Sequence, residues 1–369
     1  MTRQSICVEP ITRNQSSLVT AELGFGRHFT DRMFTQRYTL ENGWENPTIG
    51  PYHALSLDPA AAALHCGQMV FDGTKAYRRP DGDINLFRIN RNVDRLNRSA
   101  ERMGMPTVDE ALHIQAIKTL VSLEHHWIPE VEDASLYIRP VVMATEPVLE
   151  VRASHEYLHY IILSPVGPYF PDGFNPISVY VSHDHVRAVR GGTGEAKTPG
   201  NYAASIAISE AARGKGCQQV LWLDAVERRY IDEVGAMNIA FVYGDREIRT
   251  PPLSGAILHG VTRDSVLRLA PDLGFDMYER PLTIEQVWRD IENGHITEAF
   301  GMGTAAVIAP VGAMVYRERE ATLNGGKTGP VARCLYDALT DIQYGRTEDP
   351  YDWATIVPVA RDELPSMVS

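Results

Sequence analysis

The sequence is poor in positive charge and in cysteine, and both shortages limit what the protein can be. Lysine and arginine total 35 against 47 aspartates and glutamates, which gives a net charge of −12 with histidine neutral. A chain of this sign has little general affinity for polyanions, so nucleic acids and anionic membrane surfaces are poor partners. The four cysteines are far apart and form no pair with metal-ligand spacing: Cys7, Cys66, Cys217 and Cys334. This usage favours a reducing compartment, and we expect a cytoplasmic protein without a metal site.

Long apolar runs are also missing. The longest candidate, Ala305–Val315, has eleven residues and contains Pro310, whereas a membrane helix needs about 18–20 residues. The chain starts with Met-Thr-Arg-Gln-Ser, which lacks the apolar core of a signal peptide. We therefore expect no association with a membrane.

The chain does contain enough apolar material for a large core. It has 369 residues, of which 44% are hydrophobic and 22% are charged. At about 100–200 residues per domain, this length suggests two domains. Four prolines and two glycines between residues 165 and 176 indicate a stiff, exposed connector. We expect a small N-terminal domain over 1–165, a connector over 166–176 and a large domain over 177–369.

Hydrophobic periodicity and turn residues predict both helices and strands in each half. In the first half we expect a helix from near Val93, a second from Thr107 to Pro129 with Glu110 completing a capping box, and strands at Leu64–Phe71, Ile84–Arg88, Ser135–Met143 and Tyr157–Ser164. In the second half we expect helices at Tyr202–Arg213, Thr262–Leu273 and Ile284–Asn293, and strands at Ile177–Val181, Gln219–Asp224, Asn238–Tyr243 and Ala305–Ile308. This mixture predicts an α+β chain, and a cleft between two domains is a usual place for a ligand.

The segment Gly191–Tyr202 combines four glycines with a single lysine, Lys197, just before a predicted helix. A nucleotide phosphate loop, G-x-x-x-x-G-K-[ST], would need a glycine where Ala196 stands, and Pro199 interrupts the helix that should follow such a loop. A lysine in a cleft can instead lose its proton and attack a carbonyl group to form a Schiff base. From this segment alone, a surface lysine on a flexible loop remains open as well.

Three further segments contain groups that a planar, phosphorylated ligand needs. Thr262 would cap a predicted helix whose free N–H groups suit a phosphate, and Thr304 follows a glycine turn. Glu233 belongs to a carboxylate pair with Asp232 in an otherwise apolar strand, where a buried Glu233 would need a cationic or proton-donating partner. The alternatives are an ordinary helix cap, an ordinary turn and a surface acid. Together with Lys197, these groups are what pyridoxal 5′-phosphate requires.

Several motifs in this order resemble the branched-chain amino acid aminotransferases, which are fold-type IV enzymes that use pyridoxal phosphate. The motifs extend from about residue 22 to about residue 346 and include Phe71–Tyr77, Asn92–Arg95, Leu136–Pro140, Gly191–Tyr202, Gly216–Leu223, Glu233–Asn238, Gly260–Arg263, Gly301–Thr304 and Asp341–Gly345. The resemblance implies an α+β fold in which the cofactor lies between a smaller N-terminal and a larger C-terminal domain. It also implies a homodimer, in which the loop near Leu149–Val151 reaches the neighbouring subunit's pocket.

The resemblance further implies roles for individual residues. Lys197 corresponds to the lysine that forms the Schiff base and carries the catalytic proton, Glu233 to the acid that faces the pyridine nitrogen, and Tyr202 to the tyrosine that hydrogen-bonds the ring hydroxyl. The phosphate-binding set corresponds to Arg95, Val261, Thr262 and Thr304. The substrate pocket corresponds to Phe25, Cys66, Phe71, Tyr137, Arg139, Tyr169 and Ala305.

Some positions depart from the family pattern. Cys66 replaces a usual tyrosine, Glu150 replaces a glycine in the loop expected from the neighbouring subunit, and Pro199 replaces a glycine after the lysine. His259 stands where a proline is common, and Asp72 replaces a usual glutamate. The cofactor-binding residues are thus intact, whereas the walls near the substrate side chain are not standard.

The expected activity is transfer of an amino group between branched-chain or similar apolar L-amino acids and 2-oxoglutarate, as in amino-acid biosynthesis. One alternative is a specialised biosynthetic aminotransferase with a bulkier or more polar substrate. Another is a cofactor-binding protein with weak catalysis and an interaction role, which the intact Lys197, Tyr202 and Glu233 disfavour.

Overall fold

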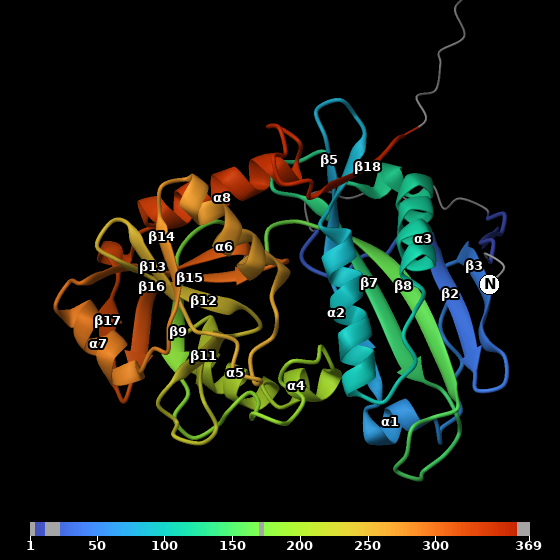
Figure 1. Cartoon of the computed structure of the whole chain (residues 1–369), viewed down its shortest axis with the longest axis horizontal. Coiled ribbons are helices and arrows are strands. Elements are labelled where there is room, and N and C mark those ends of the chain that lie inside the picture. The colour runs from blue at the N-terminus through green and yellow to red at the C-terminus, as the bar shows by residue number, and fades with distance from the viewer. Residues whose placement is uncertain (1–3, 12–22, 170–172, 360–369) are drawn as a thin grey trace, which may run out of the picture.

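Two large β-sheets, each flanked by helices, make up the fold (Figure 1). The computed structural model describes residues 4–11, 23–169 and 173–359. One sheet is formed mainly by the first half of the chain and the other by the second half. The α+β fold expected from the sequence is therefore confirmed.

Among the described residues, the first sheet has nine strands in the order β1-β3-β2-β8-β7-β5-β6-β18, with β4 paired to β7. Neighbouring strands are antiparallel apart from the parallel pair β1 and β3. The strands are β1 Cys7–Val8, β2 Arg32–Thr39, β3 Gly43–Pro51, β4 Met69–Phe71, β5 Thr74–Arg78, β6 Ile84–Phe87, β7 Ser135–Ala144, β8 Glu156–Val166 and β18 Ala354–Val357. The helices of this half are α1 Ala62–Cys66, α2 Ile89–Arg102 and α3 Glu110–Leu123, followed by a 3₁₀ turn at His125–Trp127.

In the part of the chain that the structure describes, the second sheet also has nine strands, in the order β11-β10-β9-β16-β15-β12-β13-β14, with β17 paired to β16. It is mixed, since β9 is parallel to both β10 and β16, and β13 is parallel to β14. The strands are β9 Ile177–Val181, β10 Gln219–Leu223, β11 Ile231–Val234, β12 Asn238–Tyr243, β13 Glu247–Thr250, β14 Asp276–Glu279, β15 Ile296–Gly303, β16 Val307–Tyr316 and β17 Arg319–Thr322. The helices are α4 Pro199–Ala203, α5 Ile206–Gly214, α6 Val261–Asp272, α7 Ile284–Glu292 and α8 Pro330–Gln343, with a 3₁₀ turn at Asn324–Gly326.

The helices pack on the sheets through apolar faces that repeat every three or four residues. In α3, Ile117, Leu120 and Val121 are buried and join a core cluster with strands of the first sheet. In α8, Leu335 and Leu339 are fully buried in a cluster with the second sheet. Each such side chain contributes about 1.5–3 kcal/mol on burial. Among the described helices, none is both long enough and apolar enough to span a bilayer.

The predicted strand Leu64–Phe71 is wrong in its first half. Residues Ala62–Cys66 form α1, which ends at Gly67 with a left-handed φ of 61°, a conformation that glycine adopts without steric cost. The strand then starts at Met69. Periodicity alone does not distinguish a short helix from a strand in an apolar run of this length.

The start of α3 also differs from the prediction. The side chain of Asp109 accepts the Leu112 N–H at 2.7 Å, so Asp109 is the N-cap in place of the predicted Thr107–Glu110 capping box. Aspartate and threonine are both good caps, and the sequence does not rank two candidates so close together.

In the second half, two predicted elements have different bounds. The single helix expected over Tyr202–Arg213 is divided into α4 and α5, and α4 already begins at Pro199. The strand expected from Ala305 begins at Val307, because residues 304–306 form a turn.

The chain passes from the first sheet to the second between Val166, the end of β8, and Ile177, the start of β9. This is the stretch predicted to be a connector, although residues 170–172 within it lie outside the described residues. The division into domains over 1–165 and 177–369 stays a prediction. One element departs from it, because β18 pairs with β6 of the first sheet.

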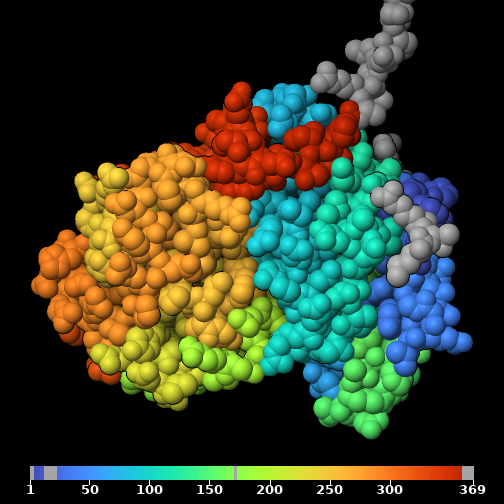
Figure 2. All heavy atoms as spheres, in the orientation of Figure 1, coloured from blue at the N-terminus to red at the C-terminus, as the bar shows by residue number. Residues whose placement is uncertain are grey.

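The C-terminal segment from α8 to β18 links the two halves. It forms the red ridge along one edge of the molecule and lies over both halves (Figure 2). Its helix packs against the second sheet and its strand extends the first. The two sheets are thereby held on either side of a common cleft.

Candidate active site

A cavity of about 360 Å³ lies between the two sheets, which is within the range of small-ligand pockets. The first half of the chain contributes Phe25, Phe71, Arg95, Tyr137 and Arg139, and the connector contributes Tyr169. The second half contributes Lys197, Tyr202, Glu233, Val261, Thr262, Thr304 and Ala305. Of the predicted site residues, all of which lie in the described part of the chain, only Cys66 does not line this cavity.

Lys197 is held in place by contacts to the first half of the chain. Its backbone N–H donates to Ser99 Oγ on α2 at 2.9 Å, and its carbonyl oxygen accepts the Phe71 N–H at 3.0 Å. The side-chain Nζ donates to the Tyr202 hydroxyl at 3.0 Å and lies 5.3 Å from the centre of the Phe71 ring. This is the geometry of a positioned amine and not of a surface lysine on a flexible loop.

Glu233 on β11 is 3% exposed and has a buried cation as its partner. Arg187 Nε lies 2.6 Å from Oε2, and the side chain of Arg187 is itself only 7% exposed. Oε1 accepts hydrogen bonds from the Asn238 amide at 3.1 Å and from the Leu258 N–H at 3.0 Å. Burial raises the pKa of Glu233, and the Arg187 guanidinium opposes that rise. The surface acid that the sequence left open is excluded.

Arg95 on α2 forms a buried ion pair with Asp72. It donates from Nε and Nη2 to the two carboxylate oxygens at 2.8 and 2.7 Å, and from Nη1 to the His259 carbonyl at 3.3 Å. Burial by itself would raise the pKa of Asp72, but Arg95 and the Asn92 amide outweigh it, so the pKa is lowered. Arg95 therefore faces the cavity from a fixed position, with part of its charge balanced by Asp72.

The start of α6 and the turn after β15 supply hydroxyl groups and backbone N–H groups. The N-cap of α6 is Gly260 and not Thr262 as predicted, so Thr262 lies in the first turn. A Cβ at Gly260 would overlap the amide oxygen of Asn238, so a larger residue there would force the Asn238 side chain to move. N–H groups in a first helical turn have no partner within the helix and suit an anion. Gly301–Gly303 continue β15, and the turn begins only at Thr304.

Aromatic rings form the wall on the side of the first sheet. The Phe25 ring lies 4.9 Å from that of Tyr137 and 5.3 Å from that of Tyr169, both edge to face. Arg139 Nη2 donates to the Tyr137 hydroxyl at 3.0 Å, and its guanidinium lies 4.7 Å from the Phe71 ring centre. This wall combines apolar surface with one cation.

Two residues next to the cavity were missed in the sequence. Lys75 is buried and donates from Nζ to the Ala305 carbonyl at 2.7 Å, and its burial lowers the pKa to about 8. Lys75 lies within the Phe71–Tyr77 motif, and this position in the sequence could have pointed to it. Arg187 lies between β9 and α4 in a stretch without helix or strand, where no periodicity marks a buried arginine.

Cys66 and Glu150 lie away from this cavity. Cys66 is exposed at the end of α1, which replaces the first half of the expected strand Leu64–Phe71. Glu150 lies in the loop between β7 and β8, and its carboxylate pairs with Arg152 at 3.1 Å. Neither residue contributes to the wall formed by its own chain.

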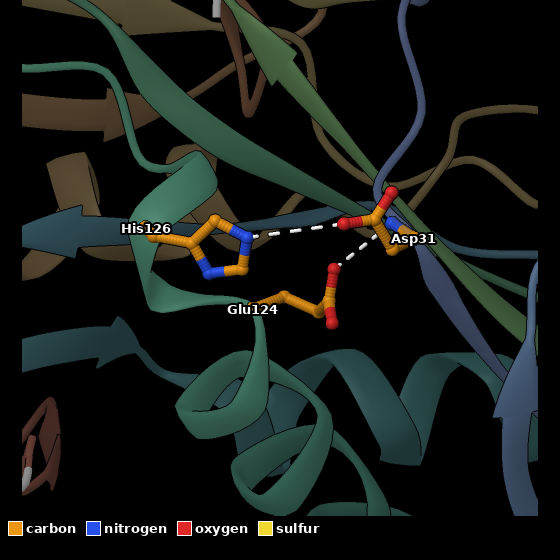
Figure 3. Close-up of side chains that lie close together, drawn as sticks. All are labelled: Asp31, Glu124 and His126. Atoms are coloured by element: carbon orange, nitrogen blue, oxygen red, sulfur yellow. Dashed lines mark hydrogen bonds and ion pairs between the residues drawn. The ribbon is translucent and has the colours of Figure 1, made fainter. Parts of the chain in front are cut away.

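A second polar cluster, Asp31, Glu124 and His126, has side chains close enough to hold a metal ion (Figure 3). The Glu124 oxygens already accept the Asp31 N–H at 2.9 Å and Arg32 Nη1 at 3.2 Å. The His126 Nε2 is 3.9 Å from Asp31. We interpret this cluster as an ion-pair network that joins β2 to the end of α3, and we assign no metal to it.

Known proteins are similar to this chain over most of its length. Residues 69–314 match the family described as amino-transferase class IV. Branched-chain-amino-acid aminotransferase 2 of Bacillus subtilis (strain 168) is 47% identical over 357 residues, which cover 97% of this chain and 98% of that protein. The crystal structure of the Escherichia coli branched-chain amino acid aminotransferase superposes with a TM-score of 0.74 at 26% identity and covers 89% of this chain and 99% of that one. The T.th. branched-chain amino acid aminotransferase with pyridoxamine 5′-phosphate gives a TM-score of 0.72 at 26% identity, with 88% and 98% covered. This chain belongs to the class IV aminotransferase family.

Proposed function

We propose that the protein is a pyridoxal-phosphate-dependent aminotransferase that moves the amino group between branched-chain L-amino acids and 2-oxoglutarate. The observation that carries the proposal is one cavity in which the Lys197 amine, the buried Glu233 carboxylate and the anion-binding start of α6 all face the same space. The names of the relatives support the substrate class. The cysteine usage supports a cytoplasmic location, which is part of the same proposal.

The residues present fit this cofactor. Lys197 would bind its aldehyde carbon, and Tyr202 would donate to or accept from the ring oxygen, since its hydroxyl already lies 3.0 Å from the lysine amine. The phosphate would be held by Arg95, by the Val261–Thr262 backbone and hydroxyl, and by Thr304. When bound, the cofactor supplies an electron sink for the carbanion at the substrate Cα.

Glu233 would keep a proton on the pyridine nitrogen. A carboxylate does this only while it is ionised, and burial works against ionisation by raising its pKa. Arg187, at 2.6 Å, and two N–H donors stabilise the charged form. Arg187 is therefore a positioning residue in this proposal, because it acts through Glu233.

Lys197 would also move the proton between the substrate Cα and the cofactor. The contacts of its backbone to Ser99 and Phe71 fix where the amine can reach. A proton carrier must lie within hydrogen-bond reach of its target, so these two anchors contribute directly to the rate.

The aromatic wall would receive the substrate side chain. Phe25, Phe71, Tyr137 and Tyr169 exclude water and offer apolar contact to an aliphatic group. Arg139 is the cation available to a second carboxylate, which distinguishes glutamate and 2-oxoglutarate from the branched-chain pair.

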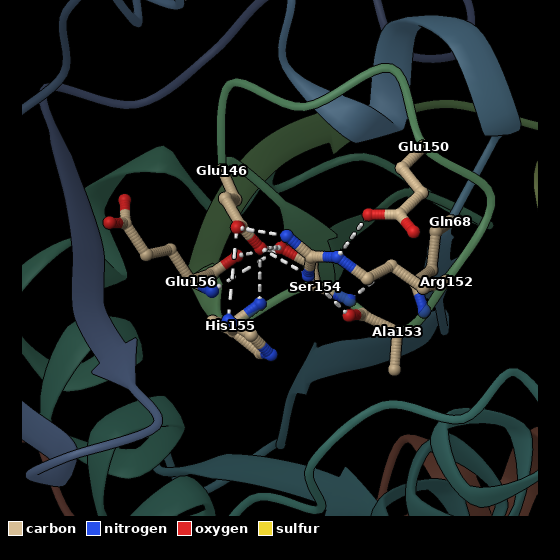
Figure 4. A network of polar contacts seen from close by, with 8 residues as sticks. All are labelled: Gln68, Glu146, Glu150, Arg152, Ala153, Ser154, His155 and Glu156. Atoms are coloured by element: carbon tan, nitrogen blue, oxygen red, sulfur yellow. Dashed lines mark hydrogen bonds and ion pairs between the residues drawn. The ribbon is translucent and has the colours of Figure 1, made fainter.

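We further propose that the protein is a homodimer, with the loop between β7 and β8 in the interface. This loop exposes two apolar side chains, Leu149 at 66% and Val151 at 89%. Arg152 holds the loop from inside by donating to both Glu146 oxygens at 3.0 and 2.6 Å and to Glu150 at 3.1 Å (Figure 4). The hydrogen bonds from Arg152, and after them other donors, lower the pKa of Glu146 to about 2. The ion pair between Arg152 and Glu146 therefore persists at neutral pH.

The experiment is a panel of L-amino acid donors with 2-oxoglutarate as acceptor and glutamate as the measured product. We expect leucine, isoleucine and valine to give the highest kcat/KM, by about 10- to 200-fold over donors that do not fit the apolar wall. The Lys197→Ala variant is the negative control. A higher kcat/KM with polar or aromatic donors would contradict the branched-chain substrate class but would still support an aminotransferase.

A further inference from the structure

Two consecutive residues of β11 line two different cavities. Glu233 lines the active-site cavity, and Asp232 lines a separate cavity of about 350 Å³. Successive side chains of a strand point to opposite faces, which accounts for the separation. The second cavity is also lined by Arg190, Tyr230 and a set of apolar residues that includes Pro251, Pro252, Pro281 and Ile257.

The Asp232 carboxylate has no hydrogen-bond or ion-pair partner in the described part of the chain, although the charges of Arg187 and Arg190 act on it from a distance. Asp232 is 6% exposed. A second acid of the cavity, the half-buried Asp224, is already satisfied, because it accepts the backbone N–H groups of residues 226, 227, 229 and 230. A buried, unpartnered carboxylate costs free energy, and a ligand that pairs with it would recover that cost.

Burial and the neighbouring charges set the protonation of Asp232. Burial, followed by the charges of Glu233 and Asp224, raises the pKa of Asp232, and Arg187 and Arg190 oppose the rise, so that the resulting pKa is about 7. The group is therefore poised between its neutral and charged forms near neutral pH. A positively charged ligand would favour the charged form.

Arg190 provides the opposite charge in the same cavity. Its Nε donates to the Ser254 carbonyl at 2.8 Å, and in the described part of the chain its two Nη atoms have no hydrogen-bond partner. The cavity thus offers an unpaired anion, a cation with free donors, and an apolar wall of prolines and Ile257.

We propose that this cavity is a second binding site, distinct from the active site, for an α-amino acid with an apolar side chain. The ammonium group would pair with Asp232, the carboxylate with Arg190, and the side chain would lie against the prolines. A metal ion is a poorer occupant, since among the described residues only one buried carboxylate of this cavity is unsatisfied. The inference does not depend on the proposed function, because no residue of the active-site cavity takes part.

The test uses the cofactor-loaded enzyme and N-methyl-L-leucine as the probe, with binding followed by calorimetry. A secondary amine keeps the charged ammonium and the carboxylate but is not a substrate for simple amino-group transfer. Asp232→Asn should weaken binding at least tenfold, whereas Glu227→Gln, which removes an exposed acid of the same rim, should change it less than twofold. Arg190→Ala should weaken binding of the probe but not of N-methyl-3-methylbutylamine, which is the probe without its carboxylate.

Two further measurements separate this site from the active site and from a folding defect. Lys197→Ala should bind the probe as the unmodified enzyme does. In the unmodified enzyme the affinity should rise about tenfold between pH 6 and pH 8, as Asp232 ionises with a pKa of about 7. Unchanged binding in Asp232→Asn, a flat pH dependence, loss of binding in Lys197→Ala, or no binding at about 10 mM probe would each overturn the proposal.

Discussion

The ion pair between Glu233 and Arg187 stabilises the charged form of the buried Glu233 carboxylate in the active site. Replacing Glu233 by glutamine removes the carboxylate and leaves Arg187 as a buried cation without its anion. Loss of one electrostatic partner in such a site costs about 3–4 kcal/mol of barrier. We therefore expect kcat/KM for leucine to fall by about 100- to 1000-fold in Glu233→Gln, as measured by steady-state kinetics.

The control for this substitution is Glu285→Gln, which makes the same chemical change at an exposed acid on α7. Cofactor affinity should fall far less than the rate in Glu233→Gln, because the phosphate contacts remain. A loss of activity under threefold would mean that Glu233 does not act on the ring nitrogen.

The residues that the sequence singled out lie around one cavity, with the exception of Cys66, but the sequence did not show the partners that hold them. Lys197, Tyr202 and Glu233 belong to local motifs, and the cavity wall includes all three. Arg187 lies 46 positions before Glu233 in a loop, and such a pairing depends on how two distant segments fold together. Cys66 shows the converse: the resemblance placed it in the pocket, where the family usually has a tyrosine, but it is exposed at the end of α1.

Among the short elements, the loop that leads to α4 depends on close backbone packing at Gly194. A Cβ there would overlap the carbonyl oxygen and the Cα of Ala256. Gly194→Ala should therefore displace the loop that positions Lys197, lower the unfolding free energy by about 1–3 kcal/mol, and weaken cofactor binding. Thermal unfolding and cofactor titration measure the two effects.

Gly200 in the same segment is a matched control. It lies inside α4, a methyl group added there would meet no atom within 4 Å, and the position does not need a positive φ. Gly200→Ala should be neutral or should stabilise the helix by up to about 1 kcal/mol. Equal damage from both substitutions would contradict the role given to Gly194.

The contact between α3 and β8 contains two buried histidines, His113 and His159, which stack with 3.2 Å between Nδ1 and Nε2. Burial lowers the pKa of His113 to about 4 and that of His159 well below its usual value. The unfolded value is about 6.5. The stability that this pair contributes is therefore complete above about pH 6.5 and is lost as pH falls toward 4, by about 3 kcal/mol for His113.

Urea unfolding between pH 8 and pH 4 measures this loss. His113→Leu removes one of the two proton-binding sites, so its stability should fall less steeply with acid than that of the unmodified protein. The exposed His183→Leu is the control and should keep the original slope. Parallel curves for all three proteins would exclude the histidine pair as the cause.

Element types were predictable from the sequence where one apolar face repeats over many residues, as in α3 and β7. They were not predictable where a single residue decides, as at Gly67, Asp109 and Gly260. Several neighbouring residues could begin or end the element at such a position. Contacts from other segments, such as that of Asn238 with Gly260, decide which residue does so.

For the whole molecule, the proposed dimer makes the loop between β7 and β8 a site of assembly. Leu149→Asp would place a charge where an apolar side chain is expected to be buried, and it should shift the mass in sedimentation from dimer toward monomer. Val131→Asp changes an apolar residue that is 43% exposed in another segment and serves as the control. Dissociation in neither variant, or in both alike, would place the interface elsewhere.

The α+β class followed from the mixture of helix and strand patterns along the chain, but the arrangement into two nine-stranded sheets among the described residues did not. The return of β18 to the first sheet did not follow either, because a four-residue strand near the end has no pattern long enough to assign it. Long-range pairings of short strands depend on the completed fold and not on local sequence.

The central claim is that Lys197, and no other lysine, binds the cofactor through its amine. The chain has five lysines, and Lys75 is the competitor, since it is buried next to Ala305 at the cavity wall and has a pKa lowered to about 8. The direct measurement is borohydride reduction of the enzyme with pyridoxal phosphate, followed by peptide mass spectrometry. We predict a pyridoxyl-phosphate adduct on the peptide containing Lys197 in stoichiometric yield. An adduct on Lys75, or no adduct on either lysine, would contradict the account.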